Sequence, residues 1–151
     1  FIPMCALNVV KGMILFMKAI YISIKPTHLN KIIKGEKTYE FRNYVPKKGV
    51  DTLFVYESFP TCELRYVIKI GEIIKYPNKI VKKGVGNDEF NRGNKKSKYA
   101  YEIKEVYKLD KFIPLKVLKE DYGFNPPQAY AYSDRYLKLT DCIINSKKIK
   151  A

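Results

Sequence analysis

The sequence predicts an α+β fold, a small mixed β-barrel of five to six strands with two to three short helices. Three observations favour this fold class. The chain has 151 residues, which is the size of one domain with its own core. Several segments alternate apolar and polar residues with the period of a β-strand. The alternation breaks at Gly71 and before Val106, as it does where β-bulges help a small barrel to close.

The first strand and helix have clear limits. Residues 18–25 alternate strictly, so a strand is expected with Ile20, Ile22 and Ile24 inward and Tyr21, Ser23 and Lys25 outward. Pro26 ends this strand. Thr27 is expected to cap a helix of two turns, and Gly35 to stop it. The apolar stripe of the helix consists of Leu29, Ile32 and Ile33.

A short strand over residues 38–42 follows directly. Its period of two sends Tyr39 and Phe41 to the core and Thr38, Glu40 and Arg42 to the other face. Lys37, at the entry to the strand, adds an ammonium to this polar row. Such a cluster can grip a planar polar ligand or a phosphate. The alternative, of equal weight, is a solvated strand face with an ion pair between Glu40 and a neighbouring cation.

The middle of the chain predicts further strands. Residues 51–59 are apolar on both faces, as in a barrel strand that is covered on its outside. The segment ends in Glu57 and Ser58 before a proline, and these two polar residues are expected either to line a cleft or to form an ordinary turn. Residues 64–74 alternate again. Residues 75–98 are irregular, with short helical pieces expected at Asn78 and around residues 88–91.

In the last third of the chain, the sequence pattern predicts a strand over residues 99–109 and a short helix over residues 115–122 that ends at Gly123. A rigid turn at residues 125–128 leads to an aromatic segment that ends near Leu137, read as an edge strand or a clamp over the barrel. We expect residues 1–16 to be an N-terminal appendage or an artificial extension, residues 17–140 to be the domain, and residues 141–151 to be a frayed basic tail.

The charge of the chain favours polyanions. Twenty-nine Lys and Arg residues oppose 15 Asp and Glu residues, for a formal net charge of +14. Nucleic acid is the commonest polyanionic partner, although an A+T-rich genome would also enrich lysine. The irregular segment is the most basic part of the chain, and it either contacts phosphates or is a solvated loop. Its candidate contacts are Lys82, Lys83, Arg92, Lys95 and Lys96.

The scarcity of cysteine and histidine limits the chemistry. Cys5, Cys62 and Cys142 are scattered, which argues against a disulfide framework or a zinc site and favours a reducing, cytoplasmic location. His28 is the single histidine, so a triad or a multi-histidine metal site is not expected. No metal or other cofactor is therefore predicted. The interrupted apolar run near the N-terminus is too short for a membrane span.

Residues 35–42 carry a family resemblance. Gly35, Lys37, Glu40 and Arg42 match the G-x-K-x-x-E-x-R signature, so the chain resembles the ASCH domains, a branch of the PUA-like β-barrel superfamily. The resemblance covers residues 17–139. It implies a PUA-like barrel with a cleft beside the first helix, where RNA or a single nucleotide binds. Residues carried over to this cleft are Lys37, Glu40 and Arg42, with Lys25, Thr38 and Ser58 as neighbours.

Some members of the family are hydrolases that cleave the amide of an acetylated cytidine, or RNA. The amidohydrolase branch resembles this chain at Lys37 but has a threonine nucleophile where this chain has Glu40. Thr38 would have a different reach, so the covalent mechanism does not carry over. The first hypothesis is therefore a binding module for RNA or a modified nucleotide. The alternative is a metal-independent hydrolase with Lys37 and Glu40 as its acid-base pair. A third is a protein-interaction domain that uses exposed tyrosines.

Overall fold

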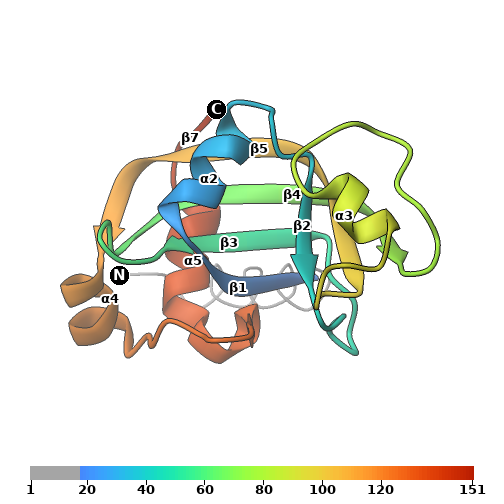
Figure 1. Cartoon of the computed structure of the whole chain (residues 1–151). Helices are drawn as coiled ribbons and strands as arrows, with labels where there is room; N and C mark the ends of the chain where they lie inside the picture. Colours follow the sequence, from blue (N-terminus) through green and yellow to red (C-terminus); the bar gives the residue numbers. More distant parts are fainter. Residues whose placement is uncertain (1–17) are drawn as a thin grey trace.

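The computed structural model describes residues 18–151, so the expectations for residues 1–16 and for a start at Met17 lie outside the described residues. These residues form one seven-stranded sheet in the order β2-β5-β4-β3-β1-β6, with β7 paired to β5 (Figure 1). The strands are β1 Ala19–Ile24, β2 Tyr39–Arg42, β3 Thr52–Glu57, β4 Glu63–Lys75, β5 Tyr99–Pro114, β6 Ala131–Tyr132 and β7 Lys148–Lys150. The helices are α2 Pro26–Ile33, α3 Asn87–Asn91, α4 Leu115–Tyr122, the 3-10 helix η1 Ser133–Tyr136 and α5 Leu137–Asn145.

The predicted α+β class is confirmed, with more elements than expected. β1 and β3 are parallel, and the other pairs are antiparallel, so the sheet is mixed as predicted. The register of β4 against β5 shifts between Ile70 and Ile73, which confirms the irregularity at Gly71. It shifts again where Lys69 and Ile70 face Glu105 and Ile103, which confirms the slip before Val106. Bulges of this kind bend and twist a sheet.

The sheet is covered on both faces, by α2 on one side and α5 on the other (Figure 1). Ile20, Ile22 and Ile24 pack with Leu29 and Ile32 of α2 in one core, as predicted. A second core joins the other face of β1 and β3 to α4 and α5; its members include Tyr21, Phe54, Phe124, Leu118, Leu139 and Ile143. Each face of the sheet therefore has its own apolar core.

Two expectations fail because of α5. Tyr21 was expected outward, but it is fully buried, and its hydroxyl lies 2.7 Å from the Thr140 hydroxyl of α5. Residues 141–151 were expected to fray, but α5 continues to Asn145 and the strand β7 pairs with β5. Leu139 and Ile143 lie four residues apart, so both point to the sheet from one helix face. The C-terminal residues are therefore part of the domain.

The ends of the short helices follow simple local rules. α2 begins at Pro26 with Lys25 as its N-cap, so the prediction of a cap at Thr27 is wrong. Proline suits the first helical position because its φ is fixed and its missing N–H would be unpaired there. Gly35 and Gly123 have φ values of +78° and +62°, which confirms both predicted stops. α3 is confirmed, whereas Asn78 lies in a bend rather than a helix.

No helix among residues 18–151 is both long and apolar enough to cross a membrane.

Candidate functional site

The strand β2 places three charged groups together. The Arg42 guanidinium donates from Nε to Oε2 of Glu40 at 3.0 Å, and its Nη2 forms an ion pair with the same oxygen at 2.8 Å. Lys37 Nζ lies 3.5 Å from Oε1 of the same carboxylate. The exposed side-chain fractions are 6% for Lys37, 9% for Glu40 and 15% for Arg42. This Lys37–Glu40–Arg42 cluster is therefore largely buried, and its net charge is positive.

Arg42 also connects β2, at one edge of the sheet, to β1, the neighbour of the other edge strand β6. Its Nη2 donates to the main-chain carbonyl oxygen of Ser23 in β1 at 3.0 Å, although β2 and β1 are not paired as strands. Tyr44, just after β2, donates to the Ala129 carbonyl oxygen at 2.7 Å, and its ring stacks on Tyr130 with centroids 4.9 Å apart. We call this junction, formed by the side chains of Arg42, Tyr44 and Tyr130 and the Ser23 carbonyl, the seam. The charged cluster thus lies where side chains, and not a strand ladder, close the sheet.

Lys37 is held between a carboxylate and an aromatic ring. Its Nζ lies 4.4 Å from the centroid of the Phe41 ring, and Lys95 Nζ lies 4.5 Å from the same centroid. Burial lowers the pKa of Lys37, the charge of Glu40 opposes this effect, and the charge of Lys95 adds to it. Partial burial and the Lys37 charge also lower the pKa of His28, on α2. The ammonium of Lys37 is therefore easier to deprotonate than a solvated lysine.

Lys25 and Ser58 lie at the neighbouring end of β1 and β3. Ser58 bonds to the Ile24 carbonyl oxygen from its main-chain N at 3.0 Å and from its hydroxyl at 3.4 Å. Lys25 follows Ile24, and its side chain is exposed at the start of α2. Ser23, whose carbonyl accepts from Arg42, is two residues before Lys25. These two predicted residues therefore lie at the end of β1 that carries Ser23, the acceptor of the Arg42 bond.

The Thr38 side chain contacts the loop before α3. Its hydroxyl donates to the Lys83 carbonyl oxygen at 3.2 Å and accepts from Asn87 Nδ2 at 3.1 Å. These contacts tie β2 to the loop before α3. The strand begins at Tyr39, one residue later than expected, so Thr38 lies just before it. The two contacts of its hydroxyl are both with this loop.

The basic segment contributes one cation to the cluster among its predicted contacts. Lys95 reaches the Phe41 ring, as described above. Lys82 instead pairs with Glu102 at 2.5 Å, which offsets its charge. The remaining candidates are exposed to solvent on the loop around α3, namely Lys83, Arg92 and Lys96. The segment therefore divides into one lysine at the site and a set of surface charges.

Three residues of the seam were not among the predicted site residues. They are Ser23, Tyr44 and Tyr130, and Tyr44 is the member with a sequence signal, because it follows Arg42 by two residues, the period of the strand. Glu57 was expected to line a cleft or precede a turn. Its carboxylate is 4% exposed and pairs with Arg65 at 2.8 Å and with the Thr61 hydroxyl at 3.0 Å. Residues 58–61 form the turn, so the second expectation is the one observed.

The arrangement is suited to binding an anion. One carboxylate serves two cations, and the ammonium of Lys37 keeps donor capacity because its single contact with Glu40 is long for a charge-assisted hydrogen bond. Arg42 Nη1 lies 3.5 Å from the Tyr44 hydroxyl, and the Tyr44 ring stacks on that of Tyr130. Within residues 18–151, no group of three His, Cys, Asp or Glu residues is placed to hold a metal ion.

Solved structures match most of the chain. A tyrosine-to-phenylalanine mutant of the ASCH protein from Zymomonas mobilis aligns with a TM-score of 0.66 at 18% identity, covering 86% of this chain and 99% of that chain. The ASCH structure from the same organism aligns with a TM-score of 0.63 at 18% identity, covering 86% of this chain and 96% of that chain. A serine-to-alanine mutant of it aligns with a TM-score of 0.63 at 20% identity, covering 86% of this chain and 97% of that chain. No protein-family model and no curated protein matches the chain. The described residues therefore have the fold of these ASCH structures, a small α+β barrel.

Proposed function

We propose that the protein binds RNA, or a single modified nucleotide, at the Lys37–Glu40–Arg42 cluster. The observation that carries this proposal is the sharing of one buried carboxylate by two buried cations. The uncompensated positive charge favours a phosphate or a base oxygen, while the carboxylate can accept from an amino group on a base edge. Both kinds of group are present on every nucleotide that carries an exocyclic amine.

Two further features support a nucleic-acid ligand over a simple inorganic anion. The Tyr44 hydroxyl lies next to Arg42 and the Tyr44 ring stacks on Tyr130, and unpaired bases are commonly bound by stacking on such rings. Lys25 at the start of α2 and Lys95 over the Phe41 ring add positive charge, within a chain whose net charge is +14. Phosphate contacts of this kind make affinity fall steeply with salt.

The test is a fluorescence anisotropy titration with a short labelled single-stranded RNA of mixed sequence. Between about 50 mM and 200 mM KCl the affinity should fall by more than about tenfold if several phosphates are contacted. Lys37→Met should weaken binding by at least about tenfold at fixed salt. The control is Lys119→Met, which removes the same charge from an exposed position of α4.

Lys37→Met should fold, because Glu40 keeps its bonds to Arg42 when the ammonium is removed. Circular dichroism of the variant checks this point. Equal affinities for Lys37→Met and Lys119→Met would mean that binding depends on overall charge alone, and would remove the cluster from the proposal.

A hydrolase acting on a modified nucleoside or on RNA is the second candidate. The lowered pKa of Lys37 favours it, because an amine that deprotonates more easily serves better as a general base near neutral pH. Glu40 would be its acid-base partner. The wild type and Lys37→Met are incubated with total RNA and modified nucleosides in EDTA, and products are read by mass spectrometry. A product that requires Lys37 supports the hydrolase; an unchanged pool from an RNA-binding preparation leaves a binding module.

A cytoplasmic location is part of the same proposal. Cys62 and Cys142 are both free thiols in the structure, as expected in a reducing compartment. Alkylation of the protein in intact cells, compared with alkylation after reduction, measures whether these thiols are free in vivo.

A further inference from the structure

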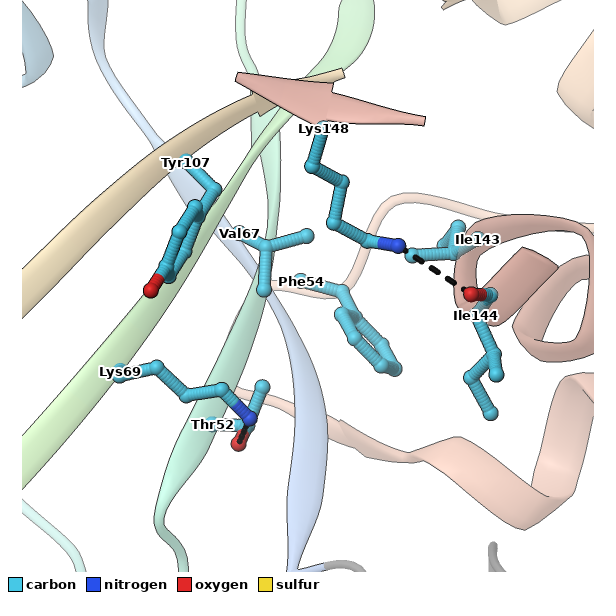
Figure 2. Close-up of a pocket in the computed structure, with 8 residues that line it drawn as sticks. All are labelled: Thr52, Phe54, Val67, Lys69, Tyr107, Ile143, Ile144 and Lys148. Atoms are coloured by element: carbon cyan, nitrogen blue, oxygen red, sulfur yellow. Dashed lines mark hydrogen bonds between the residues drawn. The ribbon is translucent and has the colours of Figure 1, made fainter. Parts of the chain in front are cut away.

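A second pocket lies on the opposite side of the sheet from α2, between the sheet and α5 (Figure 2). Its volume is about 470 Å³, within the range of about 300–1,000 Å³ that small-molecule sites occupy. The apolar wall consists of Phe54, Val67, Ile143 and Ile144. Phe54, Val67 and Ile143 belong to the core shared with α5, whereas Lys37, Glu40 and Arg42 are not among the residues that line this pocket.

Two lysines face this apolar wall. Figure 2 shows Lys148 and Lys69 on opposite sides of the Val67 and Phe54 side chains, with both amines reaching into the pocket region. Lys148 Nζ donates to the carbonyl oxygens of Ser146 at 2.8 Å and Ile144 at 3.3 Å. Lys69 Nζ donates to the Thr52 hydroxyl at 3.0 Å.

Neither ammonium forms an ion pair with a carboxylate among residues 18–151 at 4.0 Å or less. Burial lowers the pKa of Lys148, and the charge of Lys69 lowers it further, while Asp110 opposes both. Two like charges thus act on one another beside an apolar wall. An anion between them would relieve this repulsion, since opposite charges within a few ångströms favour the ionised forms.

We propose that this pocket binds a small organic anion that has one carboxylate or phosphate group and an apolar ring as its body. The two lysines supply the charge complement, and the Phe54 and isoleucine side chains supply the contact surface for the ring. A neutral apolar molecule would leave both ammonium groups without a counter-charge. A polyanion such as RNA would have to place phosphates against the apolar wall, so it fits less well. The site does not depend on the proposed function of the cluster at the seam.

The test uses 2-naphthoate and the neutral 2-naphthamide, which share a ring system and differ in charge. The full chain, labelled at isoleucine and valine methyl groups, is titrated with each compound and followed by NMR. 2-Naphthoate should shift the methyl signals of Val67, Ile143 and Ile144 in a saturable way. 2-Naphthamide should bind at least about tenfold more weakly, the loss of one favourable charge contact.

Lys69→Met and Lys148→Met should each weaken 2-naphthoate by about tenfold or more, while the exposed Lys119→Met should bind it as the wild type does. Lys148→Met also loses two hydrogen bonds at the end of α5. If Lys148→Met fails to fold for this reason, the affinity of Lys69→Met alone tests the proposal. Thr52 keeps its bond to Asp51 in Lys69→Met.

Equal binding of the acid and the amide, or of Lys69→Met and the wild type, would overturn the proposal. Methyl shifts confined to other parts of the protein would do the same. 2-Naphthyl phosphate is the second anionic probe, and whichever anion binds more tightly identifies the group that the lysines take. Lys37→Met should retain 2-naphthoate binding, which keeps this result separate from the RNA titration.

Discussion

Arg42 Nη2 donates to the main-chain carbonyl oxygen of Ser23 at 3.0 Å, and this contact connects the edge strand β2 to β1, which lies next to the opposite edge strand. The same guanidinium holds the carboxylate of Glu40. One side chain therefore closes the barrel and orients the charged cluster. The stability of the barrel and the geometry of the site depend on each other through this residue.

Arg42→Lys should destabilise the protein although it keeps the charge. A lysine cannot bond to both the carboxylate and the distant carbonyl, because it lacks the planar fork of the guanidinium. We expect a loss of about 1–3 kcal/mol in the free energy of unfolding, measured by urea denaturation. Arg92→Lys, at the exposed end of α3, is the control and should change it by less than about 0.5 kcal/mol. Equal stabilities for the two variants would argue against closure by Arg42.

Stability should depend on pH through Lys37. Its folded pKa is lowered below the ordinary value of 10.5, so between these two values the unfolded chain binds more protons at this site. The free energy of unfolding must therefore rise with pH across that window. Urea denaturation of the wild type and Lys37→Met from neutral pH to below pH 10 measures the difference. The wild type should gain stability relative to the variant as the pH rises.

The comparison stops below pH 10 because buried tyrosines act in the opposite direction. Burial raises the pKa of Tyr101 and of Tyr21, so the folded state keeps protons that the unfolded chain loses above pH 10. Stability then falls with rising pH. A constant difference between the wild type and Lys37→Met over the lower range would mean that Lys37 titrates as a solvated lysine.

Gly86→Ala should disturb the site, whereas Gly35→Ala should cost backbone strain alone. Both glycines have positive φ, +85° and +78°, which costs other residues about 1–2 kcal/mol. A Cβ at Gly86 would lie 2.8 Å from atoms of Phe41 and Lys95, while nothing lies within 4 Å of one at Gly35. Gly86→Ala should therefore lose more stability by urea denaturation and more RNA affinity by anisotropy. Matching losses would exclude the contact with Phe41.

Tyr21→Phe should cost about 1 kcal/mol, because Thr140 keeps its bond to the Ser133 carbonyl at 2.7 Å. Thr140→Val should cost more, since it leaves the buried Tyr21 hydroxyl without this partner. Adding Tyr21→Phe to Thr140→Val should then cost little or nothing. Thermal unfolding of the three variants measures this order. Additive losses would show that the two hydroxyls do not act as a pair.

Local patterns predicted the elements that depend on near neighbours. Alternation placed Ile20, Ile22 and Ile24 on one face, and residues with positive φ, Gly35 and Gly123, ended two helices. The spacing within residues 37–42 also brought the three charged groups together, because a strand repeats every two residues and Lys37 enters from the helix stop. These features are encoded within a few residues.

Contacts between distant segments were not predictable in the same way. α5 contains Thr140 and the isoleucines of residues 143–144, whose branched side chains favour strands; docking of Leu139 and Ile143 on the sheet makes the segment a helix. Because α5 was not predicted, the alternation of β1 indicated an exposed Tyr21. The curvature of the sheet is what brings the Ser23 carbonyl to Arg42 and the Tyr130 ring to Tyr44. The second pocket combines residues from five elements and has no local signature.

The seam has a consequence for how this barrel varies. The hydrogen bonds of a strand ladder are made by main-chain atoms, which every substitution except one to proline leaves in place. Here Arg42 and Tyr44 carry the closure. The rigidity of the barrel at the edge that carries the charged cluster is therefore set by two side chains, and single substitutions can loosen or tighten it while every strand stays paired.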